Sequence, residues 1–251
     1  MLDDIVNVIA PLYNENKIVS IVDVFGGSGN VIINIPVEWN VNRVYNDLDS
    51  ILYKTMLTLQ DPKLREELYD KLTYTLNSRE LFKSIKAKSY DEWTAYDYIY
   101  TMLTCHNGDL SQYGVAINQP DRLLTRKIDN VIKNSIFLKN IKLENLDFEK
   151  LIEKYKSPRT LFYCDPPYLA YLKKYKIKFS KDDMFRLYNI LADSNSYYLL
   201  NEVEQDFNDI NDIFGMYKFT KKYRNSVVRN RNQLSNSVIK SYRTEGFWFN
   251  F

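Results

Sequence analysis

The tetrapeptide Asp165-Pro166-Pro167-Tyr168 holds the residue types in this sequence best suited to chemistry. An exocyclic aromatic amine is a poor nucleophile because its lone pair is delocalised into the ring. The Asp165 carboxylate and the Pro166 carbonyl can each accept one amine hydrogen, which turns that lone pair towards an electrophilic methyl group. Proline rigidity fixes the carbonyl, and Tyr168 offers a ring face for a planar base. The tetrapeptide therefore predicts amine methylation without a metal or a histidine base, and the alternative is an ordinary turn.

The second candidate site is a glycine-rich turn, which holds Gly26, Gly27 and Gly29 out of only seven glycines in the chain. Such a turn between a buried strand and a helix lets the backbone approach a ligand closely. Asp47 follows about 20 residues later, where an acid can accept ribose hydroxyls. The turn lacks both GxGxxG and a GK[ST] ending, which disfavours dinucleotides and nucleoside triphosphates. The pattern favours a nucleoside ligand without phosphates, and a tight turn without a ligand is the alternative.

Short buried strands are expected to position both sites. Residues 17–25 read as a strand that runs into the glycine turn, with a helix from about Asn30. Residues 160–164 read as a strand that ends directly before Asp165, where ligand crevices form in open α/β sheets. The other expected elements are strands at 42–46, 196–200 and 246–251 and a helix at 179–193 with Ser180 as its N-cap.

The middle of the chain has a different pattern. Residues 54–157 contain polar amphipathic segments with few convincing strands. Helices are expected there at 63–77, 78–87 and 91–104. We interpret 54–157 as a helical insert between the two parts of an α/β domain, residues 1–53 and 158–251.

Composition limits the class of protein. The 251 residues are 45% hydrophobic and 26% charged, which is typical of a folded globular chain. Two cysteines and one histidine are too few for a disulfide framework or a zinc site, so no metal is expected. No apolar stretch approaches the roughly 18 residues of a membrane span, and the start is acidic, unlike a signal peptide. We therefore expect a cytoplasmic protein.

The net charge of +2 conceals a local basic tract. No acidic residue occurs between Asp212 and Glu245, and tyrosine, asparagine and serine are interleaved with the cations. This composition suits phosphate contacts. The alternative is a solvated edge hairpin protected by its charge. The basic residues are Lys218, Lys221, Lys222, Arg224, Arg229, Arg231, Lys240 and Arg243.

Three motifs together resemble one family, the Dam-like DNA adenine-N6 methyltransferases. VDVFGGSGNV at 22–31 resembles the family's cofactor motif, YNDLD at 45–49 its ribose-binding segment, and YCDPPY at 163–168 its catalytic motif. The order of the motifs matches from about residue 20 to the end. The resemblance implies an α/β, Rossmann-like methyltransferase sheet with an inserted helical target-recognition domain. It also implies S-adenosylmethionine as cofactor and adenine in double-stranded DNA as substrate, reached by base flipping.

The resemblance also implies roles for individual residues. Asp165 and the Pro166 carbonyl would bind the target amine, and Tyr168 would stack on the flipped base. The HNG segment at 106–108, followed by Gln112-Tyr113-Gly114, is loosely similar to the segment that precedes the family's recognition residues. The expected cofactor-binding residues are Asp23, Phe25, Gly27, Gly29 and Asp47. The expected DNA-binding residues are Tyr113, Lys222, Arg224, Asn225, Arg229 and Arg231.

The sequence departs from the family pattern at its start. Residues 1–17 contain nothing like the Trp-Ala-Gly-Gly-Lys motif that helps to seal the methionine end of the cofactor site. Another segment can close the site, a partner chain can complete it for an otherwise monomeric protein, or the chain is a silent DNA-binding protein. Amine methylation of RNA or of a protein glutamine is a further alternative. The composition suggests a low-GC bacterium or its phage, and it leaves the role open among restriction-modification, phage defence and regulation.

Overall fold

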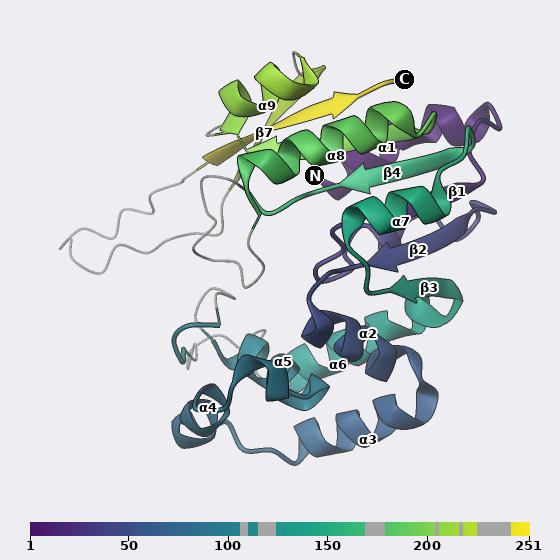
Figure 1. Cartoon of the computed structure of the whole chain (residues 1–251). Coiled ribbons are helices and arrows are strands. Elements are labelled where there is room, and N and C mark those ends of the chain that lie inside the picture. The colour runs from purple at the N-terminus through teal and green to yellow at the C-terminus, as the bar shows by residue number, and fades with distance from the viewer. Residues whose placement is uncertain (106–109, 115–123, 169–178, 204–205, 216–217, 225–241) are drawn as a thin grey trace. The chain divides into compact units, whose positions relative to one another are not determined.

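Figure 1 shows the computed structural model, which describes residues 1–105, 110–114, 124–168, 179–203, 206–215, 218–224 and 242–251. The strands are β1 Ser20–Asp23, β2 Asn42–Asn46, β3 Ile141–Glu144, β4 Thr160–Cys164, β5 Tyr197–Val203, β6 Phe219–Arg224 and β7 Tyr242–Phe249. The α-helices are α1 Leu2–Asn14, α2 Ser50–Gln60, α3 Pro62–Thr73, α4 Arg79–Lys86, α5 Ala95–Thr104, α6 Leu124–Ser135, α7 Phe148–Tyr155, α8 Lys181–Asp193 and α9 Phe207–Phe214. Short 3₁₀ turns include η1 Ile32–Asn34, η2 Tyr90–Glu92 and η4 Ile136–Asn140. Within these described ranges, no helix is long and apolar enough to cross a membrane.

The seven strands form a sheet in the order β3-β2-β1-β4-β5-β7-β6. The pairs β2–β3, β1–β4 and β4–β5 are parallel, whereas β7 is antiparallel to both β5 and β6. Every residue of β1 and β4 is buried, as expected for parallel strands covered on both faces. The order 3-2-1-4-5 is that of doubly wound α/β proteins, so the expected Rossmann-like fold is confirmed.

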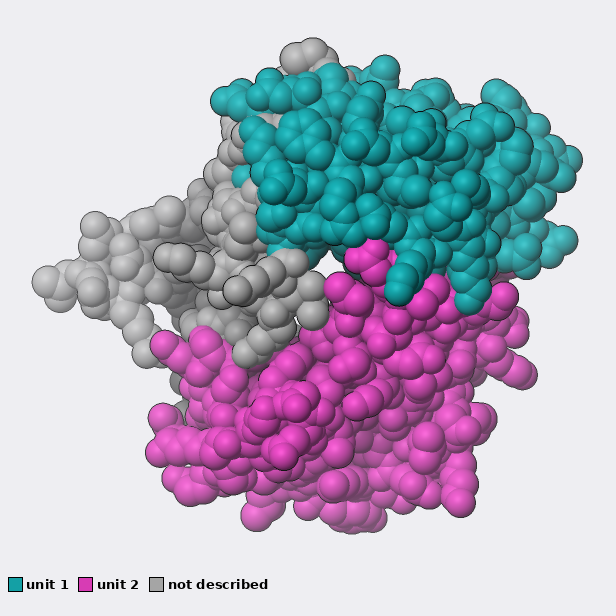
Figure 2. All heavy atoms as spheres, in the orientation of Figure 1, with its two compact units in different colours: residues 1–25, 38–42, 148–251 teal, residues 26–37, 43–147 magenta. Residues whose placement is uncertain are grey.

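The chain divides into two compact units, coloured separately in Figure 2. Unit 1 comprises residues 1–25, 38–42 and 148–251, and unit 2 comprises residues 26–37 and 43–147. Unit 1 therefore holds the segment of the expected catalytic tetrapeptide, and unit 2 holds the glycine turn, Asp47 and helices α2 to α6.

In unit 1, helices lie on both faces of the sheet. Asp4 of α1 pairs with Lys221 of β6, which is in register with Glu245 of β7. Trp248 of β7 donates its indole N–H to Asn211 of α9 at 3.1 Å. Side chains alternate along a strand, so Glu245 and Trp248 point to opposite faces of the sheet. Helices α1 and α9 therefore lie on opposite faces. Helix α8 contacts α7 and α9.

In unit 2, helices pack around α5, which contacts α2, α3, α4 and α6. Polar caps set where these helices begin. Asp49 caps α2, Asp61 caps α3 with Pro62 at the first position, and Thr94 forms a capping box with Asp97 at the start of α5. The buried residues that these helices bring together include Leu68, Leu72, Phe82, Ile85, Ile99, Tyr100, Leu103 and Ile128.

The strands predicted at 42–46 and 160–164 are confirmed with the same bounds. The helix predicted from about Asn30 is wrong, because the structure has only the 3₁₀ turn η1 there. Ile35 precedes Pro36, which disfavours helical backbone at that residue, and the segment is rich in β-branched side chains, which lower helix propensity. Strand β3 lies inside the region that the sequence pattern predicts as helical. Within 54–157, residues 54–147 belong to unit 2 and residues 148–157 to unit 1.

Candidate active site

Asp165 follows directly after β4, the strand between β1 and β5. Its side chain is half-buried, Pro166 is buried, and Tyr168 is half-buried. Asn201, which is fully buried in β5, donates its side-chain amide to Asp165 Oδ1 at 3.3 Å. The neighbouring strand therefore orients the carboxylate that the sequence analysis places at the reacting amine.

The surroundings of Asp165 adjust its proton affinity close to neutral pH. Burial raises the pKa of Asp165 to about 6, and the Glu245 carboxylate adds to this effect. Hydrogen bonds from Asn201 and Tyr168, together with the charge of Arg243, act in the opposite direction. Above pH 6 the group is a carboxylate that can accept amine hydrogens, and it is basic enough to take up a proton.

Carboxyl groups on neighbouring elements of unit 1 complete this environment. Glu245 of β7 is fully buried, and its Oε1 lies 2.6 Å from Arg243 Nε. Glu202 of β5 is also fully buried, and burial raises its pKa well above the usual range. Glu202 shares a hydrogen bond with Asp206. The charges that act on the pKa of Asp165 thus come from the buried Glu245 and the exposed Arg243.

Sequence reasoning did not assign roles to Asn201, Glu202 and Glu245. Asn201 and Glu202 are polar residues inside a strand whose last five residues are all buried. A polar residue in such a strand needs a partner, and this is a signal that the sequence does contain. The partner itself lies far along the chain and cannot be read from spacing.

The glycine turn and Asp47 form one hydrogen-bonded arrangement in unit 2. The Gly27 amide donates to Asp47 Oδ2 at 2.8 Å, and the Asp49 amide donates to Asp47 Oδ1 at 2.8 Å. The Tyr45 hydroxyl donates to the Gly27 carbonyl at 2.8 Å. Burial raises the pKa of Asp47, while the two backbone hydrogen bonds oppose the shift. Each carboxylate oxygen retains a lone pair for a ribose hydroxyl.

The glycines are required for different reasons. Gly27 and Gly29 have φ of +52° and +72°, which side chains with a Cβ rarely adopt. Gly26 has no such φ, but a Cβ there would lie 2.3 Å from a ring carbon of Tyr45. At Gly27 a Cβ would meet nothing within 4 Å, so the backbone of this turn has open space beside it.

Asp23 is the last residue of β1 and Phe25 lies two residues beyond it, both in unit 1. Asp23 is buried. The Phe25 ring lies 6.0 Å from Phe148 and 5.6 Å from Phe179, measured between ring centroids. These three phenylalanines form an aromatic cluster, of which sequence analysis named only Phe25.

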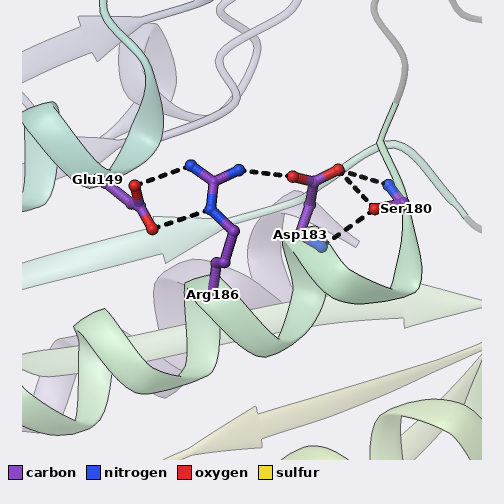
Figure 3. A network of polar contacts seen from close by, with 4 residues as sticks. All are labelled: Glu149, Ser180, Asp183 and Arg186. Carbon is purple, nitrogen blue, oxygen red and sulfur yellow. Dashed lines mark hydrogen bonds and ion pairs between the residues drawn. The ribbon is translucent and has the colours of Figure 1, made fainter.

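An ion-pair network joins α7 and α8 close to Phe148 and Phe179 in the sequence (Figure 3). Arg186 of α8 forms two hydrogen bonds to Glu149 of α7, at 3.0 and 2.7 Å, and one to Asp183 at 2.6 Å. Asp183 in turn accepts hydrogen bonds from the Ser180 amide and hydroxyl, both at 2.8 Å. Phe148 and Phe179 adjoin Glu149 and Ser180 in the sequence, and the Arg186 guanidinium lies over the Phe148 ring at 4.9 Å, so the network borders the two rings.

Comparison with known proteins identifies the family. Residues 3–230 match the family described as D12 class N6 adenine-specific DNA methyltransferase. The chain belongs to this family. The resemblance to Dam-like adenine methyltransferases is thereby confirmed, and the chain is an adenine-specific DNA methyltransferase that uses a methyl donor. No curated protein matches the sequence.

Solved structures resemble this methyltransferase only distantly. One is yhhF from Escherichia coli, a presumed methyltransferase, with 11% identity, a TM-score of 0.35, and coverage of 98% of this chain and 83% of that one. Another is a presumed methylase from Haemophilus influenzae, with 10% identity, a TM-score of 0.33, and coverage of 98% of both chains. The family match, rather than these likenesses, identifies the chain.

The basic tract of the methyltransferase is described in part. Lys222 is exposed on β6, and Arg224 is the last residue of that strand. Lys221 instead pairs with Asp4, which also accepts a hydrogen bond from the Tyr223 hydroxyl at 3.0 Å. Burial raises the pKa of Asp4, but the hydrogen bonds that Asp4 accepts lower this pKa to about 2. The remaining expected contacts, Asn225, Arg229 and Arg231, lie outside the described residues.

Tyr113 is held firmly in unit 2 of the methyltransferase. It forms an isolated β-bridge with Cys105, and its hydroxyl donates to Asn77 Oδ1 at 2.8 Å. The Arg79 guanidinium lies over its ring at 5.1 Å, and Phe82 contacts the ring edge-on. Residues 106–108 lie outside the described part. Among the residues that are described, no group of three or more His, Cys, Asp or Glu side chains is arranged to hold a metal ion.

Proposed function

We propose that this methyltransferase transfers the methyl group of S-adenosylmethionine to N6 of an adenine flipped out of double-stranded DNA. The observation that carries the proposal is Asp165, which follows a buried strand and is held by Asn201 at 3.3 Å. A carboxylate in this position is suited to a flat amine, and the family match points to adenine in DNA.

The chemistry that we infer needs few groups. Above its pKa of about 6, Asp165 accepts one N6 hydrogen, and the Pro166 carbonyl accepts the other. S-adenosylmethionine, when bound, supplies an electrophilic methyl carbon whose bonding electrons stay with sulfur as the carbon–nitrogen bond forms. Asp165 then takes the proton that N6 releases, and its raised pKa favours this transfer. Tyr168 would stack on the flipped ring.

The residues of the turn suit such a cofactor. Gly27 has φ of +52° and open space beside it, so the backbone there can lie close to a ligand. Both oxygens of Asp47 are oriented by backbone amides and keep acceptor capacity for ribose hydroxyls. Within unit 1, the Phe25 ring, packed against Phe148 and Phe179, separately offers an apolar surface.

Direct transfer is favoured over a covalent enzyme intermediate. The chain has two cysteines, Cys105 and Cys164, and both are buried as free thiols. Burial raises the pKa of Cys164 well above its usual value, so this neighbour of Asp165 remains a neutral thiol. A thiol in that state is a poor nucleophile, which supports attack by the substrate amine itself.

The test is methyl transfer from tritiated S-adenosylmethionine to unmethylated duplex DNA of mixed sequence, with nucleoside analysis of the product. We expect the label in N6-methyladenine. Asp165→Asn should abolish labelling, whereas Asp193→Asn, which changes an exposed carboxyl at the end of α8, should leave it intact. Circular dichroism of both variants verifies that they are folded.

Two results would contradict the proposal. Labelling of RNA of the same sequence, or of a glutamine-containing peptide, without labelling of DNA would assign the amine chemistry to another polymer. Absence of transfer by folded protein that still binds duplex DNA, with no S-adenosylmethionine binding detected by calorimetry, would indicate the silent DNA-binding protein.

A further inference from the structure

Two large apolar side chains of unit 2 stand out from the surface between α3 and α4. Tyr74 is 85% exposed and Leu76 is 82% exposed, more than any other large hydrophobic residue in the described part of the chain. Both belong to the short connection of residues 74–78, which we call the tyrosine-held loop. Single exposed apolar residues are ordinary on proteins, but two at this level in one five-residue loop require an explanation.

Buried or half-buried tyrosines fix this loop from beneath. The Tyr100 hydroxyl accepts from the Ser78 amide at 2.9 Å and lies 3.1 Å from the Leu76 carbonyl, to which it donates. The Thr75 hydroxyl is 3.0 Å from the Tyr96 hydroxyl, and Tyr113 donates to Asn77 at 2.8 Å. A loop held at four successive residues, 75–78, presents Tyr74 and Leu76 on a fixed backbone, so ordering them on binding costs little entropy.

Cations flank the loop on both sides. Lys71 lies over the Tyr96 ring at 4.1 Å, and Arg79 lies over the Tyr113 ring at 5.1 Å. The sequence from Lys71 to Arg79, KLTYTLNSR, contains these two cations and no acid. Two apolar side chains, Tyr74 and Leu76, thus lie between two cations in the sequence. This pattern is complementary to a polymer that carries regularly spaced negative charges with apolar surface between them.

We propose that the tyrosine-held loop contacts duplex DNA, with Lys71 and Arg79 on phosphates and with Tyr74 and Leu76 packed against sugars and base steps of a groove. The inference rests on the DNA substrate of the proposed function, and it adds a contact that does not involve the basic tract. Cations at both ends of a segment without an acid match the phosphates on either side of a groove, which favours DNA over a protein partner.

The test measures fluorescence anisotropy of a labelled mixed-sequence duplex with the full chain. The apolar variant is Tyr74→Ser combined with Leu76→Ser, and the matched control is Val37→Ser, which removes another exposed apolar side chain of unit 2, 69% exposed. We expect about a tenfold loss of affinity for the double variant with an unchanged salt slope, and no loss for the control. Tyr74→Phe with Leu76→Met should restore wild-type affinity.

The cations give an independent readout. Lys71→Gln and Arg79→Gln should each make the plot of log affinity against log salt shallower by about 0.9, as expected for the loss of one phosphate contact. Equal affinity of the double variant and the Val37→Ser control, with unchanged slopes for both cation variants, would overturn the inference. Concentration-dependent dimerisation that only the double variant abolishes would also overturn it, in favour of contact between copies.

The proposed function and this inference can fail separately. If wild-type protein binds duplex DNA through the loop but transfers no methyl group, the inference stands and the catalytic proposal fails. If wild-type protein methylates DNA while all loop variants bind normally, only the inference fails.

Discussion

Two aspartates of the methyltransferase, Asp165 and Asp47, follow buried strands but are held in different ways. Backbone amides of Gly27 and Asp49 bind the two oxygens of Asp47, so its position is part of the turn itself. The described partners of Asp165 are the side chains of Asn201 and Tyr168. Hydrogen bonds of either kind favour the charged form, but backbone amides are fixed by the fold, whereas side-chain partners can reorient.

The comparison suggests a division of roles. Burial raises the pKa of both groups, and a neighbouring carboxylate adds to the shift at each, Asp49 at Asp47 and Glu245 at Asp165. Hydrogen bonds oppose the shift, from backbone amides at Asp47 and from side chains at Asp165. The first group suits permanent recognition of hydroxyls, and the second suits a proton-accepting step. The same substitution, Asp to Asn, should therefore have different effects at the two sites.

The largest effect is expected for Asp165→Asn. Loss of the acceptor should lower the methyl-transfer rate by about 10²- to 10⁴-fold. The folded pKa of Asp165 is about 6, above its ordinary 3.8, so its favourable contribution to stability exists at low pH and is lost as pH rises through 6. The variant should thus be more stable than wild type at pH 8, by at most about 3 kcal/mol, and nearly equal at pH 4. Urea unfolding at both pH values measures this, and a destabilised variant at pH 8 would refute it.

Asp47→Asn should act in the opposite direction on stability. The side-chain amide of Asn has one oxygen, so it can accept from only one of the two backbone N–H groups. The second N–H group then faces the NH₂ group of the side chain, which is also a donor, and this costs about 1–3 kcal/mol of unfolding free energy. Affinity for S-adenosylhomocysteine should fall by about tenfold or more, with a much smaller change in kcat. Calorimetry and single-turnover rates test both parts. Equal losses of kcat at Asp47 and Asp165 would end the proposed division of roles.

The sequence predicted the elements of the two sites better than their surroundings. The strand before Asp47 and the strand before Asp165 have the predicted bounds, because short runs with β-branched or aromatic residues that end in turn residues are local signals. The helix expected from Asn30 is absent, although the segment is apolar. Pro36 and the β-branched residues disfavour helical backbone there more than the apolar pattern favours it.

The partners of Asp165 could not be predicted in the same way. Asn201 is 36 residues away in sequence, and it reaches Asp165 only through the parallel register of β4 and β5. Glu245 comes from the last strand, whose antiparallel pairing with β5 no local pattern specifies. Periodicity identifies a strand, but the neighbours of a strand are set by long-range packing, so the catalytic residue is easier to name than the groups that adjust its pKa.

Substitution of these partners should shift the pH profile of methyl transfer in opposite directions. Glu245→Gln removes a negative charge that raises the pKa of Asp165, so the acid limb of kcat should move to lower pH. Asn201→Ala removes a hydrogen bond that lowers this pKa, so the limb should move to higher pH. Both variants should keep more activity than Asp165→Asn. Glu153→Gln on the surface of α7 is the matched control, and shifts of the same sign in both variants would argue against the assigned electrostatics.

The smallest effect is expected for the network of Figure 3, which is polar like the Asp165 site but lies at the surface. Arg186, Glu149 and Asp183 are 44%, 40% and 24% exposed, so water and salt screen their charges. Arg186→Lys cannot reproduce the two parallel hydrogen bonds to Glu149, yet we expect a loss of only about 0.5–1 kcal/mol in unfolding free energy, and less in 1 M salt. Thermal unfolding at two salt concentrations measures this loss. A loss above about 2 kcal/mol that salt does not reduce would mean that α7 and α8 depend on the network as strongly as a buried pair.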